Sequence, residues 1–189
     1  MRRYLALGLC VLVTASGIFL ASVEGAVRPQ QGGEPSLRVG DRLPDVPLVG
    51  VGGQSVMLTE SSGRVKLISV VPQLNTPVCD EQTHQLSEQN GGLDRQVELI
   101  TLSTNTADDQ ARFAKKAKIG NIRFLSDAPA HGFGKQSGLL LPMYGILQRA
   151  VIVADGENIV RYVQLVPMGE VPNFAAVFEA VRQVLRSVR

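Results

Sequence analysis

One stretch constrains the fold more than any other, because it indicates a strand, a turn and the start of a helix in direct succession. The apolar run Leu67–Val71 is rich in β-branched residues and ends at Pro72, which is typical of a buried central strand. Thr76 followed by Pro77 predicts a helix start, because Thr is a favoured N-cap and Pro is favoured at the first helical position. A buried strand that leads directly into a helix is typical of α/β domains.

Cys79 falls at the third position of this predicted helix, where a capping box would carry Glu or Gln. A thiolate there would lie at the positive end of the helix dipole, near backbone amides that have no partner within the helix. Such a position favours the ionised form of a cysteine, although the acidic neighbours Asp80 and Glu81 work against it. An isolated cysteine is more often a small buried apolar side chain. From the residue alone, both interpretations stay open.

The rest of the chain alternates between predicted strands and helices, which favours a single α/β domain with a central mixed sheet flanked by helices. With 189 residues, of which 44% are apolar, the chain can bury a sizeable core. The chain is expected to begin with an N-terminal β-hairpin within Gly40–Leu58 that turns at Gly52-Gly53. The elements expected next are a helix from Pro77 to about Gln89, a strand Val97–Ser103, a helix from Ala107 to Lys118 capped by Thr106, and a short strand Ile122–Leu125. The last elements expected are a short helix and loop in His131–Leu141, two strands within Arg149–Val166 joined at Asp155-Gly156, and an amphipathic helix from about Asn173.

The N-terminus forms separate segments ahead of this domain. Arg2 and Arg3 precede the uncharged stretch Tyr4–Val23, so residues 1–25 are predicted to be a secretory signal peptide or an N-terminal membrane anchor. Residues 26–36 are predicted to be a flexible tether, and residues 37–189 the domain. We therefore expect a protein exported to a bacterial periplasm or tethered to the outer face of the inner membrane.

Composition and motifs argue against several classes of function. The net charge is only +2, the basic residues are scattered and Trp is absent, so we expect no nucleic-acid partner. The histidines His84 and His131, without a second cysteine in the domain, give no metal-ligand spacing, and no phosphate-binding loop is present. We expect no metal and no other cofactor. Thr76 occupies the place where a Cys-x-x-Cys motif ending at Cys79 needs its first cysteine, which argues against disulfide isomerase activity.

The pattern Pro72-x-x-x-Thr76-x-x-Cys79 after a buried strand resembles the active-site signature of the peroxiredoxins. More narrowly, the block Ser69–Thr83 is similar to the thiol peroxidase branch of that family, and so is the opening Gly40-Asp41-Arg42-Leu43-Pro44-Asp45. The resemblance covers about Leu37 to Leu185 and implies a thioredoxin-like fold. It also implies reduction of hydrogen peroxide or organic hydroperoxides, and a homodimer, although no residue pattern here indicates an interface.

The resemblance also implies the roles of the site residues. Cys79 would be the peroxidatic nucleophile, and Arg149 in Gln148-Arg149-Ala150-Val151 would reach its sulfur. Thr76 would bond the sulfur or the incoming peroxide, and Pro72 would shield the pocket from solvent. Plainer roles stay open from the residue types: Thr76 as a simple N-cap, Pro72 as a strand terminator, and Arg149 as a solvated side chain at a strand end.

One family feature is missing. Thiol peroxidases usually carry a resolving cysteine in an Arg-Phe-Cys segment, and the corresponding residues here are Arg112-Phe113-Ala114. The other cysteine, Cys10, lies in the predicted signal or anchor. We therefore expect a mechanism with one cysteine and an external thiol reductant, either a thioredoxin-like protein or a small thiol. The alternative is a redox sensor or thiol-binding protein that keeps the fold and uses Cys79 without turnover.

Overall fold

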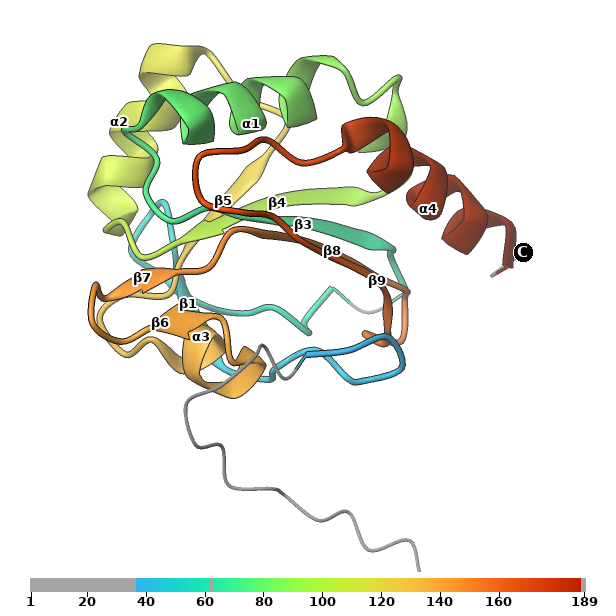
Figure 1. The fold of residues 1–189 in the computed structure, drawn as a ribbon, viewed down its shortest axis with the longest axis horizontal. Coiled ribbons are helices and arrows are strands. Elements are labelled where there is room, and N and C mark those ends of the chain that lie inside the picture. The colour runs from blue at the N-terminus through green and yellow to red at the C-terminus, as the bar shows by residue number, and fades with distance from the viewer. Residues whose placement is uncertain (1–36, 62, 188–189) are drawn as a thin grey trace, which may run out of the picture. The chain divides into compact units, whose positions relative to one another are not determined.

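A mixed sheet of seven strands runs through the part of the chain that the computed structural model describes, residues 37–61 and 63–187 (Figure 1). The strand order is β2-β1-β5-β4-β3-β8-β9; β3, β4 and β5 are parallel, and β1, β8 and β9 run antiparallel to their neighbours. The strands are β1 Pro47–Gly50, β2 Ser55–Met57, β3 Lys66–Val70, β4 Glu98–Ser103, β5 Arg123–Ser126, β8 Ala150–Ala154 and β9 Val160–Leu165.

Helices cover both faces of the sheet. On one face lie α1 (Pro77–Glu88), α2 (Ala107–Ala117) and α4 (Phe174–Ser187), which bury Leu86, Phe113 and Val177 against alternate residues of the strands. On the other face lies the short α3 (Gly132–Ser137), whose Phe133 packs in a second apolar cluster. This arrangement confirms the expected central mixed sheet with flanking helices.

The termini of the helices follow the local sequence. The Thr106 hydroxyl accepts a hydrogen bond from the Asp109 amide at 3.2 Å and so caps α2 as expected. This helix ends at Ala117, one residue before the expected end, because Lys118 adopts a left-handed conformation with φ of 55°. The predicted apolar stripe of α4 is buried at Phe174, Val177, Phe178, Val181 and Val184.

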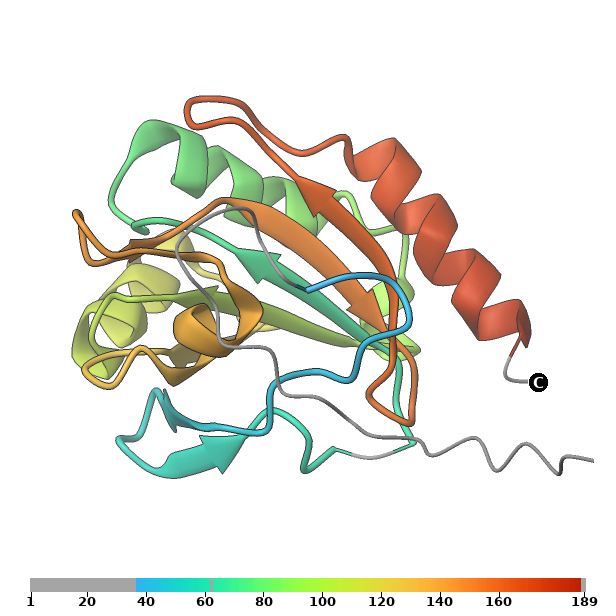
Figure 2. The ribbon, with the colours of Figure 1, turned by 60° about the horizontal axis from the view of Figure 1, so that its bottom comes forward.

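The two predicted hairpins are present at opposite edges of the sheet (Figure 2). Strands β1 and β2 pair with Leu48 opposite Val56, while β8 and β9 are joined through Asp155-Gly156. Gly156 is required in that turn, because a Cβ atom would lie 2.9 Å from the backbone of Gly63. The sequence missed a small two-stranded sheet, β6 (Leu140–Leu141) with β7 (Ile146–Leu147), since strands of two residues leave no periodic pattern.

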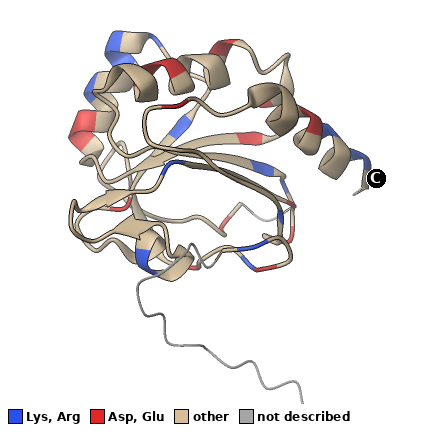
Figure 3. Ribbon diagram, viewed as in Figure 1, with Lys and Arg blue, Asp and Glu red and all other residues tan. Residues whose placement is uncertain are grey.

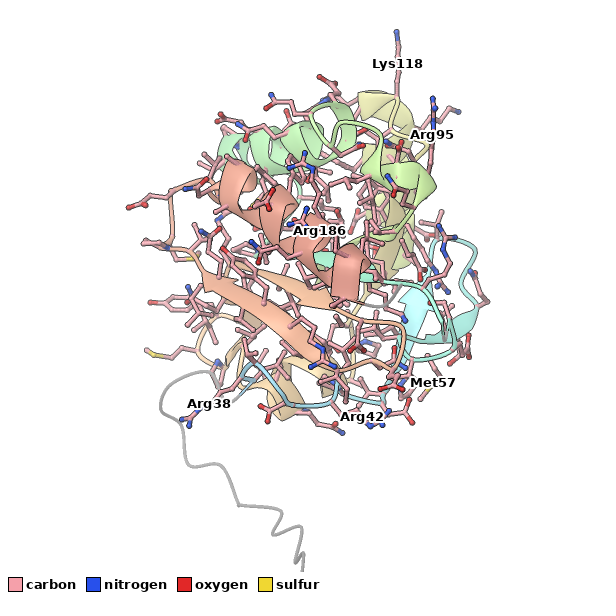
Figure 4. All side chains as sticks on the ribbon, turned by 90° about the vertical axis from the view of Figure 1, so that its right-hand side faces the viewer. Arg38, Arg42, Met57, Arg95, Lys118 and Arg186 are labelled. Atoms are coloured by element: carbon pink, nitrogen blue, oxygen red, sulfur yellow. The ribbon has the colours of Figure 1, made fainter. Side chains whose placement is uncertain are left out.

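The ends of the sheet differ in character. Cys79 follows the carboxyl end of β3, whereas Arg95 and Lys118 precede the amino ends of the parallel strands β4 and β5, and their long side chains point outward at the top of Figure 4. The exposed side of α4 carries charges of both signs (Figure 3), and Glu179 pairs there with Arg182 at 3.6 Å and with Arg186 at 2.9 Å. None of the helices in the described residues combines the length and the apolar character that a bilayer crossing requires. The predicted signal or anchor, 1–25, and the predicted tether, 26–36, lie outside the described residues.

Candidate active site

Cys79 lies in the first turn of α1, directly beyond the carboxyl end of β3. Thr76 is the N-cap residue, with extended backbone angles of φ −110° and ψ 147°, and the Asp80 amide donates to its carbonyl at 2.9 Å. The cysteine is 1% exposed and packs in the apolar cluster between the sheet and α1. Both interpretations of the sequence therefore hold in part: the residue is buried, and it occupies the helix start that favours a thiolate.

Arg149 immediately precedes β8 and reaches the sulfur. Its Nη2 atom donates a hydrogen bond to Cys79 Sγ at 3.3 Å, and the side chain is 2% exposed. Sheet register explains the meeting of residues so distant in sequence, because Val70 at the end of β3 pairs with Ala150 at the start of β8. The interpretation of Arg149 as a solvated arginine at a strand end is thus wrong.

Sequence reasoning missed Gln82 and Ser69. Gln82 lies one turn after Cys79 on α1, and its Oε1 accepts a hydrogen bond from Arg149 Nη1 while its Nε2 donates to Ser69 Oγ at 2.7 Å. Both residues are fully buried. A signal was present in the sequence: Ser69 interrupts an apolar strand, and Gln82 stands at i+3 from Cys79, on the same helix face.

The electrostatics around Arg149 favour an anion at the sulfur. Among the described residues no carboxylate forms an ion pair with the guanidinium, and its Nε has no hydrogen-bond partner. A buried positive charge without a counter-charge is costly. The thiolate of Cys79 would supply that counter-charge at hydrogen-bond distance.

Thr76 and Pro72 both flank Cys79, but neither contacts its sulfur through a hydrogen bond. The Thr76 hydroxyl donates to the Gln73 carbonyl at 3.3 Å and makes no side-chain cap, so the expected bond to the sulfur is not formed in this structure. Pro72 is buried in the turn after β3. Their roles toward a peroxide remain predictions.

Asn105 holds the turn that carries Thr76. Its side-chain Oδ1 accepts a hydrogen bond from the backbone amide of Leu74 at 2.9 Å, and its backbone amide donates to Ser103 Oγ at 3.2 Å. Leu74 is buried at 1% exposure. The loop between β4 and α2 therefore fixes the loop between β3 and α1 by a side-chain bond.

A cavity of about 610 Å³ opens between α1 and α2, next to the helix start. Neither Cys79 nor Arg149 lines it, so the sulfur is not open to this cavity. The residues that line the cavity are Leu74, Asn75, Thr76, Pro77, Asp80, His84, Asp109, Arg112, Phe113, Lys116 and Ala117.

No group of three or more His, Cys, Asp and Glu side chains within the described ranges could hold a metal ion. The ring of His84 forms a hydrogen bond with the Glu88 carboxylate at 2.9 Å.

This fold and site define a thioredoxin-like protein with one buried cysteine paired to an arginine. Known proteins of one family are similar to this chain in sequence and in fold. The Redoxin family model matches residues 38–178. The thiol peroxidase of Streptococcus pneumoniae is 35% identical over 147 residues, which cover 77% of this chain and 90% of that protein. The thiol peroxidase of Halalkalibacterium halodurans is 34% identical over 150 residues, covering 79% and 90%.

Solved structures agree with these relatives. A peroxiredoxin-like protein from Aquifex aeolicus superposes with a TM-score of 0.73 at 34% identity, covering 80% of this chain and 90% of that one. The thiol peroxidase from Chromobacterium violaceum gives a TM-score of 0.68 at 26% identity, covering 84% and 93%. The chain belongs to the thiol peroxidases of the Redoxin family, which confirms the resemblance noted in the sequence.

Proposed function

We propose that this thiol-dependent peroxidase reduces hydrogen peroxide or organic hydroperoxides at Cys79 and is regenerated by an external thiol. The observation that carries the proposal is the buried guanidinium of Arg149, 3.3 Å from the sulfur and without a carboxylate partner in the described part of the chain. A thiolate is the reactive form of cysteine, and this cation favours it.

The first step transfers one oxygen atom. The thiolate attacks one oxygen of the hydroperoxide, the O–O bond breaks, and the electron pair leaves with the second oxygen, which is released as an alcohol or as water after it takes up a proton. Cys79 becomes a sulfenic acid. Negative charge develops on the leaving oxygen. The guanidinium of Arg149 and the backbone amides of the first turn of α1 are the groups that would stabilise it. Thr76 and Pro72 are proposed to orient the peroxide and to exclude water.

Regeneration would use two thiols from outside the chain. The first condenses with the sulfenic acid to give a mixed disulfide and water, and the second releases the Cys79 thiol and a disulfide product. Cys79 is the only cysteine in residues 37–61 and 63–187, and Ala114 stands where the family resemblance implies the resolving residue. Cys10 lies outside the described residues. Because Cys79 is 1% exposed, access of the hydroperoxide and of the thiol would require a movement of the loop 72–76 or of the first helical turn.

The missing resolving cysteine would also suit a redox sensor. Repeated turnover distinguishes the proposed peroxidase from such a sensor. We expect steady consumption of hydrogen peroxide with dithiothreitol, and none with the Cys79→Ser variant. Ala114→Ser is the matched control, and it should keep the activity. A single oxidation of each molecule, without recovery on addition of thiol, would instead support the sensor.

Export and assembly are further parts of the proposal. The charged start Arg2-Arg3 followed by the uncharged stretch Tyr4–Val23 supports a signal peptide or membrane anchor, and hence a periplasmic or membrane-tethered location. Family resemblance supports a homodimer. Exposed apolar side chains at Met143, Tyr144 and Met168 would suit such a contact. Fractionation of cells that express the full chain, and light scattering of the purified domain, test these points.

A further inference from the structure

Ser69 is a polar residue at the centre of an apolar sheet. It lies in β3, where all five residues are buried, and it is itself fully buried. Burial of a hydroxyl costs free energy unless it is hydrogen-bonded, and its bond is to the Gln82 side chain, whose Nε2 donates to Ser69 Oγ at 2.7 Å. The bond therefore connects the sheet to the helix that carries Cys79.

The two ends of the Gln82 amide have different partners. Its oxygen accepts from Arg149 Nη1, whereas its nitrogen donates to Ser69. A reversed amide would set its N–H groups against the N–H groups of the guanidinium, so only one orientation serves Arg149. Ser69 supplies the acceptor that the amide nitrogen needs in that orientation. Without it, a buried donor would be left unpaired, which is unfavourable.

We infer that Ser69 is a positioning residue for the reaction at Cys79, acting through Gln82 on the guanidinium of Arg149. The inference rests on the proposed function of Cys79 and Arg149. Both members of this relay are uncharged, so they hold the guanidinium in place without neutralising it. The positive charge thus remains available to the sulfur, 3.3 Å from Nη2.

Thr101 offers a matched comparison within the same layer of the sheet. It is the register partner of Ser69 on β4, it is equally buried, and its hydroxyl has no hydrogen-bond partner. Loss of the Thr101 hydroxyl therefore removes a polar group of the same depth without breaking the relay. Thr101→Val serves as the control for Ser69→Ala.

The experiment measures single-turnover oxidation of Cys79 by hydrogen peroxide, and the pH profile of its alkylation by iodoacetamide. We expect Ser69→Ala to slow oxidation about tenfold and to move the alkylation profile to higher pH. Thr101→Val should match the wild type in both. Ser69→Thr, which keeps the hydroxyl, should retain most of the rate. Unfolding midpoints identify any variant that is damaged globally.

A double-mutant cycle separates a relay from a general loss of packing. In a Gln82→Leu background, Ser69→Ala should have no further effect on either measurement, because its action passes through Gln82. An undiminished effect in that background, or a Ser69→Ala rate within twofold of the wild type, would overturn the inference. Failure of the proposed function looks different: the wild-type protein itself would then not react with the peroxide.

Discussion

Arg149 Nη2 lies 3.3 Å from Cys79 Sγ, and the two residues are brought together across 70 positions of sequence by the antiparallel pairing of β3 with β8. Both side chains are almost fully buried. In a site with little water a charge-assisted hydrogen bond is stronger than it is at a surface. The contact therefore connects the topology of the sheet to the reactivity of one sulfur atom.

Replacement of Arg149 should impair the chemical step. We expect Arg149→Met to lower the rate of Cys79 oxidation by hydrogen peroxide about a hundredfold, the usual effect of removing one donor that stabilises developing charge. Arg149→Lys should also be slow, because a single ammonium cannot bond the sulfur and Gln82 together in the same geometry. Stopped-flow measurement gives the rates. Arg95→Met, at the opposite end of the sheet, is the control, and a wild-type rate for Arg149→Met would refute this role.

Asn105 should determine how firmly the loop before Cys79 is held. Its Oδ1 is the acceptor for the Leu74 amide at 2.9 Å. In Asn105→Ala we expect hydrogen exchange of that amide to accelerate about tenfold, whereas Asn105→Asp keeps an acceptor oxygen and should retain the protection. Exchange measured by NMR reports the individual amide. Equal protection in both variants would show that the backbone alone holds the loop.

Asp155 should make the fold sensitive to acid. Burial alone would raise the pKa of Asp155, but hydrogen bonds from the Ile159 amide, the Arg161 side chain and the Glu157 amide outweigh it, so its pKa lies below the usual 3.8. As the pH falls below 3.8, the unfolded chain binds a proton before the native state does. The stability that the carboxylate contributes is therefore present above that pH and is lost as the pH falls through the lowered native value.

Asp155→Asn tests this linkage by urea unfolding. We expect the variant to be less stable than the wild type by about 1–3 kcal/mol at neutral pH, because the amide accepts fewer of these bonds. The difference should shrink in acid. Asp108→Asn, which changes an exposed carboxylate, should have little effect at either pH. A difference that does not depend on pH would contradict the role of the ionised group.

Lys66 should make the stability of the fold rise with pH in alkali, a dependence of the same sign as that of Asp155 in acid. Burial lowers the pKa of Lys66 from 10.5, although Glu98 and Asp155 oppose the shift, and its Nζ donates to the Ser61 carbonyl at 2.6 Å and to Asn158 Oδ1 at 2.7 Å. The native state thus releases its proton at a lower pH than the unfolded chain. Stability should rise with pH between the lowered value and 10.5, and Lys66→Met should abolish that rise. Denaturant titrations across this range measure it.

The sequence predicted the elements that depend on strong local patterns, for particular physical reasons. Thr76-Pro77 fixed the start of α1, the β-branched run at Leu67 gave β3, and the family signature identified Arg149 as the partner of Cys79. Ser69 and Gln82 were not singled out, because their function depends on which side chains a helix and two strands bring together. The absence of a bond from Thr76 to the sulfur likewise depends on a rotamer that no sequence pattern specifies.

The mass of the intact domain after reaction with one equivalent of hydrogen peroxide tests the central claim most directly. We predict that the wild-type protein gains one oxygen atom, that a sulfenic-acid trap captures the product, and that Cys79→Ser gains nothing. Arg149→Met should be mostly unmodified at the time when the wild type has reacted fully. A wild-type protein of unchanged mass, or an equally fast gain in Arg149→Met, would contradict the account of a sulfur activated by the buried guanidinium.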